Sequence, residues 1–291
     1  MPKLATRMSR AKPSAIMQIA EKAKQLKASG RDIISFSIGV PNFLPGPHVY
    51  EAARKALDHD SGQYGSNRGP DALLDAFLKH LEQGGLEGYT RRSIATGIGA
   101  KHVLYNLGEL LLDPGDVIVF PVPYWTTYLD LAEILDLKAK LLPCSSDQHY
   151  KLTPAQLDAA LPGAKVFLFN NPSNPTGMVY SKDEIAALAD VLVRHPDVWI
   201  ICDDIYNRMV FDGIGYHNFV QARPELRERV IHVDSISKTY GMPGWRVGFI
   251  AAPESVASAF VTMNSNHITN VPEVVNAAAV AALSGPQDVT T

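Results

Sequence analysis

Short apolar segments that alternate with amphipathic helices constrain the fold of this chain more than any other feature. Strands that are apolar on both faces and joined by helices are typical of a parallel sheet covered on both sides. The pattern therefore predicts an α/β fold, in which three layers are built around a mostly parallel sheet. The expected strands are 32–37, 117–120, 139–143, 166–170, 198–202, 230–233 and 247–251.

Helix signals lie between most of these strands. Apolar residues at helical spacing predict helices at 14–29, 47–58, 71–81, 101–112, 181–194 and 274–283. The clearest helix start is Ser181, a favoured N-cap residue that has Glu184 three positions later, as in a capping box.

Size and charge exclude several classes of protein. The chain has 291 residues, 46% of them hydrophobic, which is enough for one large core and a small second lobe. The net charge of -3 gives no reason to expect nucleic acid or an anionic membrane as a partner. No apolar run is long enough to span a bilayer. Cys144 and Cys202 lack metal-ligand spacing, so we expect no metal site. Cys202 ends a predicted buried strand and is expected to be a core thiol. This cysteine usage favours a reducing, cytoplasmic location.

Polar side chains follow three of the predicted strands. Ligands of parallel sheets bind beyond the carboxyl ends of the strands, so residues at these positions are candidates for a site. They are Asn170, Asn171 and Asn174 after the first of the three strands, Asp203 and Tyr206 after the second, and Ser235, Ser237 and Lys238 after the third.

Lys238 is the most informative of these residues, because lysine is rarely placed just past a buried strand without a partner. A cofactor aldehyde would account for it, since an imine needs an amine that can lose its proton. The hydroxyl groups of Ser235 and Ser237 and the guanidinium of Arg246 suit a phosphate. The alternative is a surface lysine in a polar loop, which the order of flanking serines, glycines and arginine disfavours.

Four further residues are candidates for function, and a structural interpretation stands beside the functional one. Asp203 can pair with a protonated pyridine nitrogen, or it can simply cap a helix. Asn174 can donate to a phenolate oxygen on a ring, or the Asn-Pro turns around Asn174 can serve only to fix a loop. Tyr206 can form a hydrogen bond with the ring hydroxyl. Trp125 can stack on a flat ring, although a partly buried core position is the more common role.

Taken in order, the loop at 170–177, the Asp-Asp-Ile-Tyr segment at 203–206 and the stretch at 235–248 resemble the class I/II aminotransferase family of fold-type-I pyridoxal phosphate enzymes. The resemblance covers essentially the whole chain and is strongest to the bacterial aspartate aminotransferase branch. It implies an aspartate aminotransferase-like large domain, pyridoxal 5'-phosphate as cofactor and a homodimer. The implied activity moves an amino group from an L-amino acid to a 2-oxo acid.

The resemblance also implies roles for single residues. Lys238 would form the Schiff base with the cofactor and later shuttle the substrate proton. Tyr64 would reach the phosphate in the neighbouring subunit, and the backbone of Gly39 would lie near the substrate carboxylate. For the cofactor ring, Asp203 would pair with the ring nitrogen, Tyr206 and Asn174 would bind the ring hydroxyl, and Trp125 would stack on the ring. The phosphate would be held by Ser235, Ser237, Arg246 and the N–H groups of Ala100 and Lys101.

The domain layout follows from the same resemblance. Residues 1–45 are expected to form an N-terminal arm with part of a small domain, and residues 46–291 the large cofactor-binding domain. Family members continue into a C-terminal small domain, which supplies the arginine that grips the substrate α-carboxylate. No residue here matches that arginine, so we interpret the chain as a fragment without this domain.

Substrate choice rests on two positions that point in different directions. Lys101 matches the lysine that contacts the distal carboxylate in the aspartate branch, and this favours aspartate. Ile16 stands where a threonine is usual, and an apolar residue suits an aromatic or aliphatic substrate better. Two alternatives to transamination are a pyridoxal phosphate-dependent C–S β-lyase and a truncated cofactor-binding protein without efficient transamination.

Overall fold

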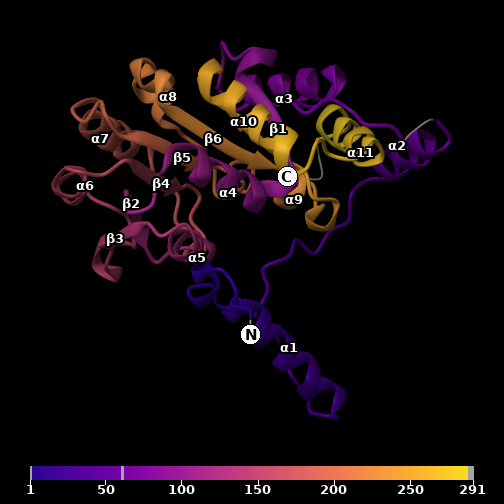
Figure 1. Ribbon diagram of the computed structural model, residues 1–291, viewed down its shortest axis with the longest axis horizontal. Helices are drawn as coiled ribbons and strands as arrows, with labels where there is room; N and C mark the ends of the chain where they lie inside the picture. Colours follow the sequence, from indigo (N-terminus) through magenta and orange to yellow (C-terminus); the bar gives the residue numbers. More distant parts are fainter. Residues whose placement is uncertain (1, 60–61, 288–291) are drawn as a thin grey trace.

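A seven-stranded sheet forms the centre of the computed structural model, which describes residues 2–59 and 62–287 (Figure 1). The strand order is β1-β7-β6-β5-β4-β2-β3. Strand β7 runs antiparallel to both of its neighbours, and the other pairs are parallel. The mostly parallel α/β sheet predicted from the sequence is therefore confirmed. The strands are β1 (Ile94–Gly97), β2 (Val117–Val122), β3 (Lys138–Pro143), β4 (Val166–Asn170), β5 (Trp199–Asp203), β6 (Val230–Ser235) and β7 (Gly248–Ala251).

The sheet separates two apolar cores because its central strands are apolar on both faces. In β4, Phe167 and Phe169 pack into one core, and Val166 and Leu168 pack into the other. All four side chains are almost fully buried. This is the period-2 alternation of a strand with both faces covered, and it explains why β4 has a continuous apolar sequence.

Helices cover both faces of the sheet. Helices α4, α5 and α10 contribute side chains to one core, and α2, α3, α6, α7, α8 and α11 contribute to the other. The helices are α1 (Ala15–Ala28), α2 (Pro47–Leu57), α3 (Asp71–Gln83), α4 (Gly99–Leu111), α5 (Thr127–Ile134), α6 (Pro154–Ala160), α7 (Lys182–Val193), α8 (Phe219–Ala222), α9 (Ile236–Thr239), α10 (Glu254–His267) and α11 (Glu273–Ser284), and short 3-10 turns lie at Thr6–Ser9, Arg91–Ser93, Ser146–Gln148, Pro224–Glu228 and Pro243–Trp245. None of the described helices is long and apolar enough to cross a membrane.

Helix α7 begins as the sequence predicts. The Ser181 side chain accepts a hydrogen bond from the Glu184 amide, and the Ser181 amide donates to Glu184 Oε2 at 2.7 Å. This reciprocal capping box satisfies two backbone N–H groups that the first turn would otherwise leave unpaired.

One predicted strand was wrong, and one strand of the sheet was missed. The segment 32–37 has no regular secondary structure, and its side chains at Ile34 and Phe36 are 80% and 93% exposed. Within the described residues no strand pairs with it, and an extended segment without a ladder partner is not a strand. Conversely, β1 (Ile94–Gly97) was not predicted, because four residues that include a threonine and a glycine give little pattern.

The segment 32–37 connects α1 to the rest of the chain. Helix α1 projects away from the sheet (Figure 1), and none of its residues is buried. Its end matches the sequence: Gly30 has φ +85°, the Gly30 amide donates to the Lys27 carbonyl, and the Arg31 amide donates to the Leu26 carbonyl. These two hydrogen bonds form the glycine-dependent Schellman motif that ends many helices.

Candidate active site

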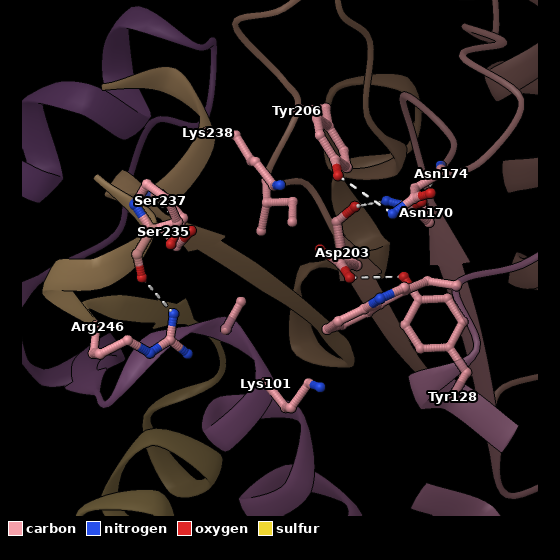
Figure 2. A pocket seen from close by; sticks show the side chains of 14 residues that line it. Lys101, Tyr128, Asn170, Asn174, Asp203, Tyr206, Ser235, Ser237, Lys238 and Arg246 are labelled. Carbon is pink, nitrogen blue, oxygen red and sulfur yellow. Dashed lines mark hydrogen bonds between the residues drawn. The ribbon is translucent and has the colours of Figure 1, made fainter. Parts of the chain in front are cut away.

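A cavity of about 320 Å³ lies at the carboxyl ends of β4, β5 and β6. Figure 2 shows Ser235, Ser237 and Arg246 on one side of it, Asp203, Tyr206 and Asn174 on the other, and Lys238 between them. Every residue that the sequence assigned to the cofactor lines this cavity except Tyr64. The lining residues are Ala100, Lys101, Trp125, Tyr128, Asn170, Asn174, Asp203, Ile205, Tyr206, Ser235, Ser237, Lys238, Pro243 and Arg246.

Asp203 is the most deeply buried charged group of the cavity. It ends β5, is 1% exposed and accepts a hydrogen bond on Oδ2 from the hydroxyl of Tyr128 at 2.7 Å. Its other oxygen, Oδ1, is buried and accepts no well-formed hydrogen bond from the described residues. Burial raises the pKa of Asp203 to about 7, the Tyr128 hydrogen bond opposes this shift, and the charge of Asp204 adds to it.

Tyr128 was missed in the sequence. It lies in α5 among apolar residues, where an aromatic side chain reads as part of the core. Its contact with Asp203 joins positions 75 residues apart. No local pattern signals such a pair, because only the sheet brings the two elements together.

A chain of hydrogen bonds links the loop after β4 to the turn after β5. Asn170 Nδ2 donates to the Asp203 carbonyl at 2.7 Å, and Asn170 Oδ1 accepts from the Asn174 amide at 2.7 Å. Asn174 Nδ2 in turn donates to the hydroxyl of Tyr206 at 3.3 Å (Figure 2). Burial raises the pKa of Tyr206 to about 12, with a smaller contribution from the charge of Asp203. The tyrosine therefore stays protonated, and its own hydrogen can be donated to a group in the cavity.

Lys238 lies in α9, the helical turn that directly follows β6, and is half-buried. Its Nζ donates to the Gly39 carbonyl at 2.7 Å and lies 5.7 Å from the centroid of the Tyr206 ring. Burial lowers the pKa of Lys238, and the charge of Asp203 opposes this shift. The structure thus brings Gly39, assigned from the sequence to the substrate, beside the lysine.

Two glycines shape the side of the cavity that holds Arg246. Gly99 has φ +76°, and a Cβ atom there would lie 2.3 Å from Arg246 Nη2. A Cβ atom on Gly248 would lie 2.6 Å from the Ala100 amide nitrogen. Only glycine at these positions lets the N-terminus of α4 approach both β7 and the guanidinium.

The donors on this side suit an anion. The thirteen-residue helix α4 has no side-chain cap at its N-terminus, so its first N–H groups remain available. Ser235 and Ser237 add two nearly buried hydroxyl groups, and Arg246 adds a cation. Helix N–H groups, hydroxyls and a guanidinium are a favourable donor set for phosphate.

Lys101 and Trp125 lie together at the cavity. Lys101 Nζ is 5.1 Å from the centroid of the Trp125 ring, within the range of a cation–π contact. The Trp125 ring meets Tyr128 edge-on, with centroids 5.7 Å apart. Two other residues singled out in the sequence are not at this site: Ile16 does not line the cavity, and the side chain of Tyr64 is 89% exposed. The assignment of Tyr64 to a neighbouring subunit stays a prediction.

The groups of pyridoxal phosphate match this set of residues. The phosphate has its donors around Arg246, and the ring hydroxyl has Tyr206 and Asn174. The protonated ring nitrogen would satisfy the buried Asp203 Oδ1, an oxygen that accepts no well-formed hydrogen bond from the described residues. The aldehyde has the amine of Lys238. The cavity therefore fits the cofactor that the sequence resemblance implies.

Comparison with known proteins gives one consistent answer. The family described as aminotransferase class I and II matches residues 31–291. The aspartate/prephenate aminotransferase of Cereibacter sphaeroides is 38% identical over 98% of this chain and 72% of its own length. The aspartate aminotransferase of Geobacillus stearothermophilus is 35% identical over 98% of this chain and 73% of its own length.

Solved structures agree with these relatives. The aspartate aminotransferase of Rhizobium meliloti superposes with a TM-score of 0.95 at 34% identity, covering 100% of this chain and 73% of that one. The aspartate aminotransferase of Thermus thermophilus with maleate gives 0.92 at 29% identity, covering 100% and 75%. The expected aspartate aminotransferase-like fold is confirmed.

Gly99→Ala should weaken pyridoxal phosphate binding at least about tenfold, because the new methyl group displaces the Arg246 guanidinium and its charge-assisted hydrogen bonds. The matched control is Gly163→Ala, at φ +77° with nothing within 4 Å of the added Cβ atom. Both variants place alanine at nearly the same positive φ, but only Gly99→Ala meets a functional group. Dissociation constants from equilibrium dialysis would contradict the prediction if the two variants lost affinity equally.

Asp203→Asn should change how stability depends on pH in the cofactor-free protein. The carboxyl group binds its proton more tightly when folded, so in the wild type it costs stability as pH rises towards about 7 and costs little near pH 4. The amide does not titrate. Relative to wild type, the variant should therefore gain on the order of 2 kcal/mol between pH 5 and pH 8. Urea unfolding measures the difference, and a difference that is constant with pH would refute the shifted carboxyl group.

Proposed function

The chain belongs to the aminotransferase class I and II family, and from that premise we propose that it moves the amino group of aspartate to a 2-oxo acid. It is a transaminase that depends on pyridoxal phosphate. The observation that carries the site assignment is the arrangement of three groups in one cavity. These are the half-buried amine of Lys238, the buried oxygen Asp203 Oδ1, which accepts no well-formed hydrogen bond from the described residues, and the Tyr206–Asn174 pair.

Pyridoxal phosphate, when bound here, supplies an aldehyde that condenses with amines and a ring that takes up the electron pair left at the substrate α-carbon. The chain supplies binding, orientation and proton transfer. Lys238 offers its Nζ as the amine, and burial favours the neutral form that can act as nucleophile and base. With the substrate amine in its place, the freed nitrogen would be able to take the proton from the substrate α-carbon and deliver it to the former aldehyde carbon of the cofactor, C4′.

Asp203 keeps the ring nitrogen protonated in this proposal. Tyr128 occupies Asp203 Oδ2, so Oδ1 is left for the N–H of the ring. A cation beside the carboxylate would lower the raised pKa of Asp203 again, and this favours the ionised form that makes the pair. Ser235, Ser237, Arg246, Ala100 and Lys101 anchor the phosphate, and Trp125 covers the ring.

Lys101 supports aspartate as the amino donor. Its exposed amine lies over Trp125 at the cavity, where a second substrate carboxylate would find a cation. Ile16, the residue that favoured an aromatic substrate, does not line the cavity. The aspartate aminotransferases among the relatives agree with this choice.

We also propose a cytoplasmic homodimer. Tyr64 carries the dimer argument, because a phosphate-binding tyrosine that is 89% exposed and lies outside its own chain's cavity can serve a second copy. The two free, buried cysteines agree with a reducing location. In the proposed layout, residues 1–45 form the arm with part of a small domain and residues 46–291 form the large domain.

Lys238→Ala should abolish the visible absorbance band that pyridoxal phosphate shows when bound to the wild type, because the imine-forming amine is lost. Some affinity should remain through the phosphate donors, and equilibrium dialysis measures it. Lys165→Ala is the control, since this exposed lysine precedes β4 at the opposite edge of the sheet. A wild-type band in Lys238→Ala would remove the lysine from its role.

Lys101→Met should lower kcat/KM for aspartate roughly tenfold and leave kcat/KM for phenylalanine unchanged, because only aspartate loses a charge-assisted contact. Transamination with 2-oxoglutarate as acceptor gives both values. An equal loss for the two amino acids would argue against distal carboxylate recognition. Release of pyruvate and ammonia from a cysteine conjugate without any 2-oxo acid would instead identify the C–S lyase.

A further inference from the structure

The two turns that carry Lys238 and Tyr206 diverge from neighbouring strands. The β5–β6 ladder ends at the pair Asp203–Val233, and the Asp204 amide adds one hydrogen bond to the Val233 carbonyl at 2.8 Å. Beyond this point the chain after β6 turns into α9, and the chain after β5 turns towards Tyr206. Lys238 Nζ and the Tyr206 ring nevertheless face each other across 5.7 Å (Figure 2). Some contact beyond the ladder has to fix this separation.

Asp234 makes such a contact from behind the cavity. It is 3% exposed and does not line the cavity. Its Oδ1 accepts from the Ser235 amide at 2.6 Å, at the start of the lysine-bearing turn. Its Oδ2 accepts from Asn207 Nδ2 at 2.8 Å, directly after Tyr206. One carboxylate is therefore bonded to both turns.

His80 braces the same two turns from helix α3. Its Nε2 lies 3.0 Å from Asp234 Oδ2, and its Nδ1 lies 3.5 Å from the hydroxyl of Tyr240, which follows α9. The His80 carbonyl accepts from Arg208 Nη2 at 2.9 Å, on the side of the Tyr206 turn. The imidazole is 5% exposed and is also outside the cavity lining.

Stability alone does not account for a buried pair of this kind. Replacing two buried polar partners by apolar side chains of similar volume is often neutral or stabilising. What an apolar pair cannot do is bond in fixed directions to the Ser235 amide, the Asn207 amide group and the Tyr240 hydroxyl. The directional contacts, rather than the buried area, distinguish this pair.

We propose that Asp234 and His80 form a positioning pair that holds the Lys238 turn and the Tyr206 turn at a fixed separation without touching the cofactor. The proposal rests on the cofactor site proposed above. It adds that the alignment of the amine with the ring-hydroxyl donors depends on two residues behind the cavity.

Hydrogen bonding by Asp234, rather than its charge, is what the proposal requires. Asp234→Asn keeps an acceptor for the Ser235 amide. The NH2 group of the new side chain at position 234 can donate to His80 Nε2. After the Asn207 amide turns over, the same NH2 group can also donate to Asn207 Oδ1. That oxygen is buried without a partner among the described residues. Asp234→Leu has a similar size but makes none of these bonds. Asn207→Ala cuts only the link to the Tyr206 turn at a half-buried position, and so disturbs folding less.

The test compares these three variants with Leu188→Ala, which removes a buried core side chain from α7 and lowers stability without touching either turn. Urea unfolding of the cofactor-free proteins gives stability, and titration with pyridoxal phosphate gives its dissociation constant. Visible circular dichroism at saturating cofactor, divided by absorbance, reports how the ring is held.

Asp234→Leu should raise the dissociation constant for pyridoxal phosphate at least about tenfold, and Asn207→Ala should raise it about threefold. Both variants should change the normalised circular dichroism. Asp234→Asn should stay within about threefold of wild type and keep its signal. Leu188→Ala should lose stability with both cofactor readouts unchanged. If Asp234→Leu does not fold, Asn207→Ala and Asp234→Asn decide the question.

Three results would overturn the positioning pair. Wild-type dichroism in Asp234→Leu or Asn207→Ala would show that the separation of the turns does not depend on these contacts. Loss in Asp234→Asn as large as in Asp234→Leu would show that charge, and not hydrogen bonding, is what matters. If wild-type protein itself gave no visible band, the cofactor site would fail and this proposal with it, whereas a wild-type band with unchanged variants would overturn only the pair.

Discussion

Parallel pairing of β4, β5 and β6 is the constraint on which the rest of the site depends. The register sets Asn170 beside Asp203, so that the Asn170 amide group reaches the Asp203 carbonyl and at the same time orders the loop that presents Asn174. Successive side chains of a strand point to opposite faces, and a slip of one residue would turn Asp203 away from the cavity. The continuous apolar runs of these strands therefore do more than fill the cores, because their packing fixes which polar residues meet at the strand ends.

Buried charge is distributed unevenly at this edge of the sheet. Three carboxyl groups are almost fully buried there, and two of them have an imidazole partner: Asp204 with His232 at 2.6 Å and Asp234 with His80 at 3.0 Å. Among the described residues Asp203 has no imidazole partner and instead accepts from the neutral hydroxyl of Tyr128. A buried carboxylate without a cation is costly, and the raised pKa of Asp203 expresses that cost. The fold thus leaves a cation-seeking carboxylate at the cavity, where the positive ring nitrogen of a cofactor would stabilise it.

Local pattern was enough to find the residues that follow strands, and not enough to find those that support them. Lys238 and Asp203 were predicted because strand ends can be read from short apolar runs. The Tyr128–Asp203 and His80–Asp234 contacts join residues 75 and 154 positions apart, and His80 reads in the sequence as one polar residue of an amphipathic helix. The strand predicted at 32–37 failed for a related reason, since its pattern is strand-like but the described chain offers it no ladder partner.

The single reversed strand explains how Arg246 reaches this edge. Strand β7 runs antiparallel to β6, with Gly248 paired to Ser235, so the residues that precede β7 lie at the carboxyl end of β6. Arg246 therefore arrives beside Ser235, whereas a parallel β7 would have placed it at the opposite edge. Strand β1 is antiparallel to β7 in turn and so ends at this edge as well, where α4 begins with Gly99 against the Arg246 guanidinium. Topology thus gathers the anion donors on one side of the cavity, and strand register sets the ring-facing groups on the other.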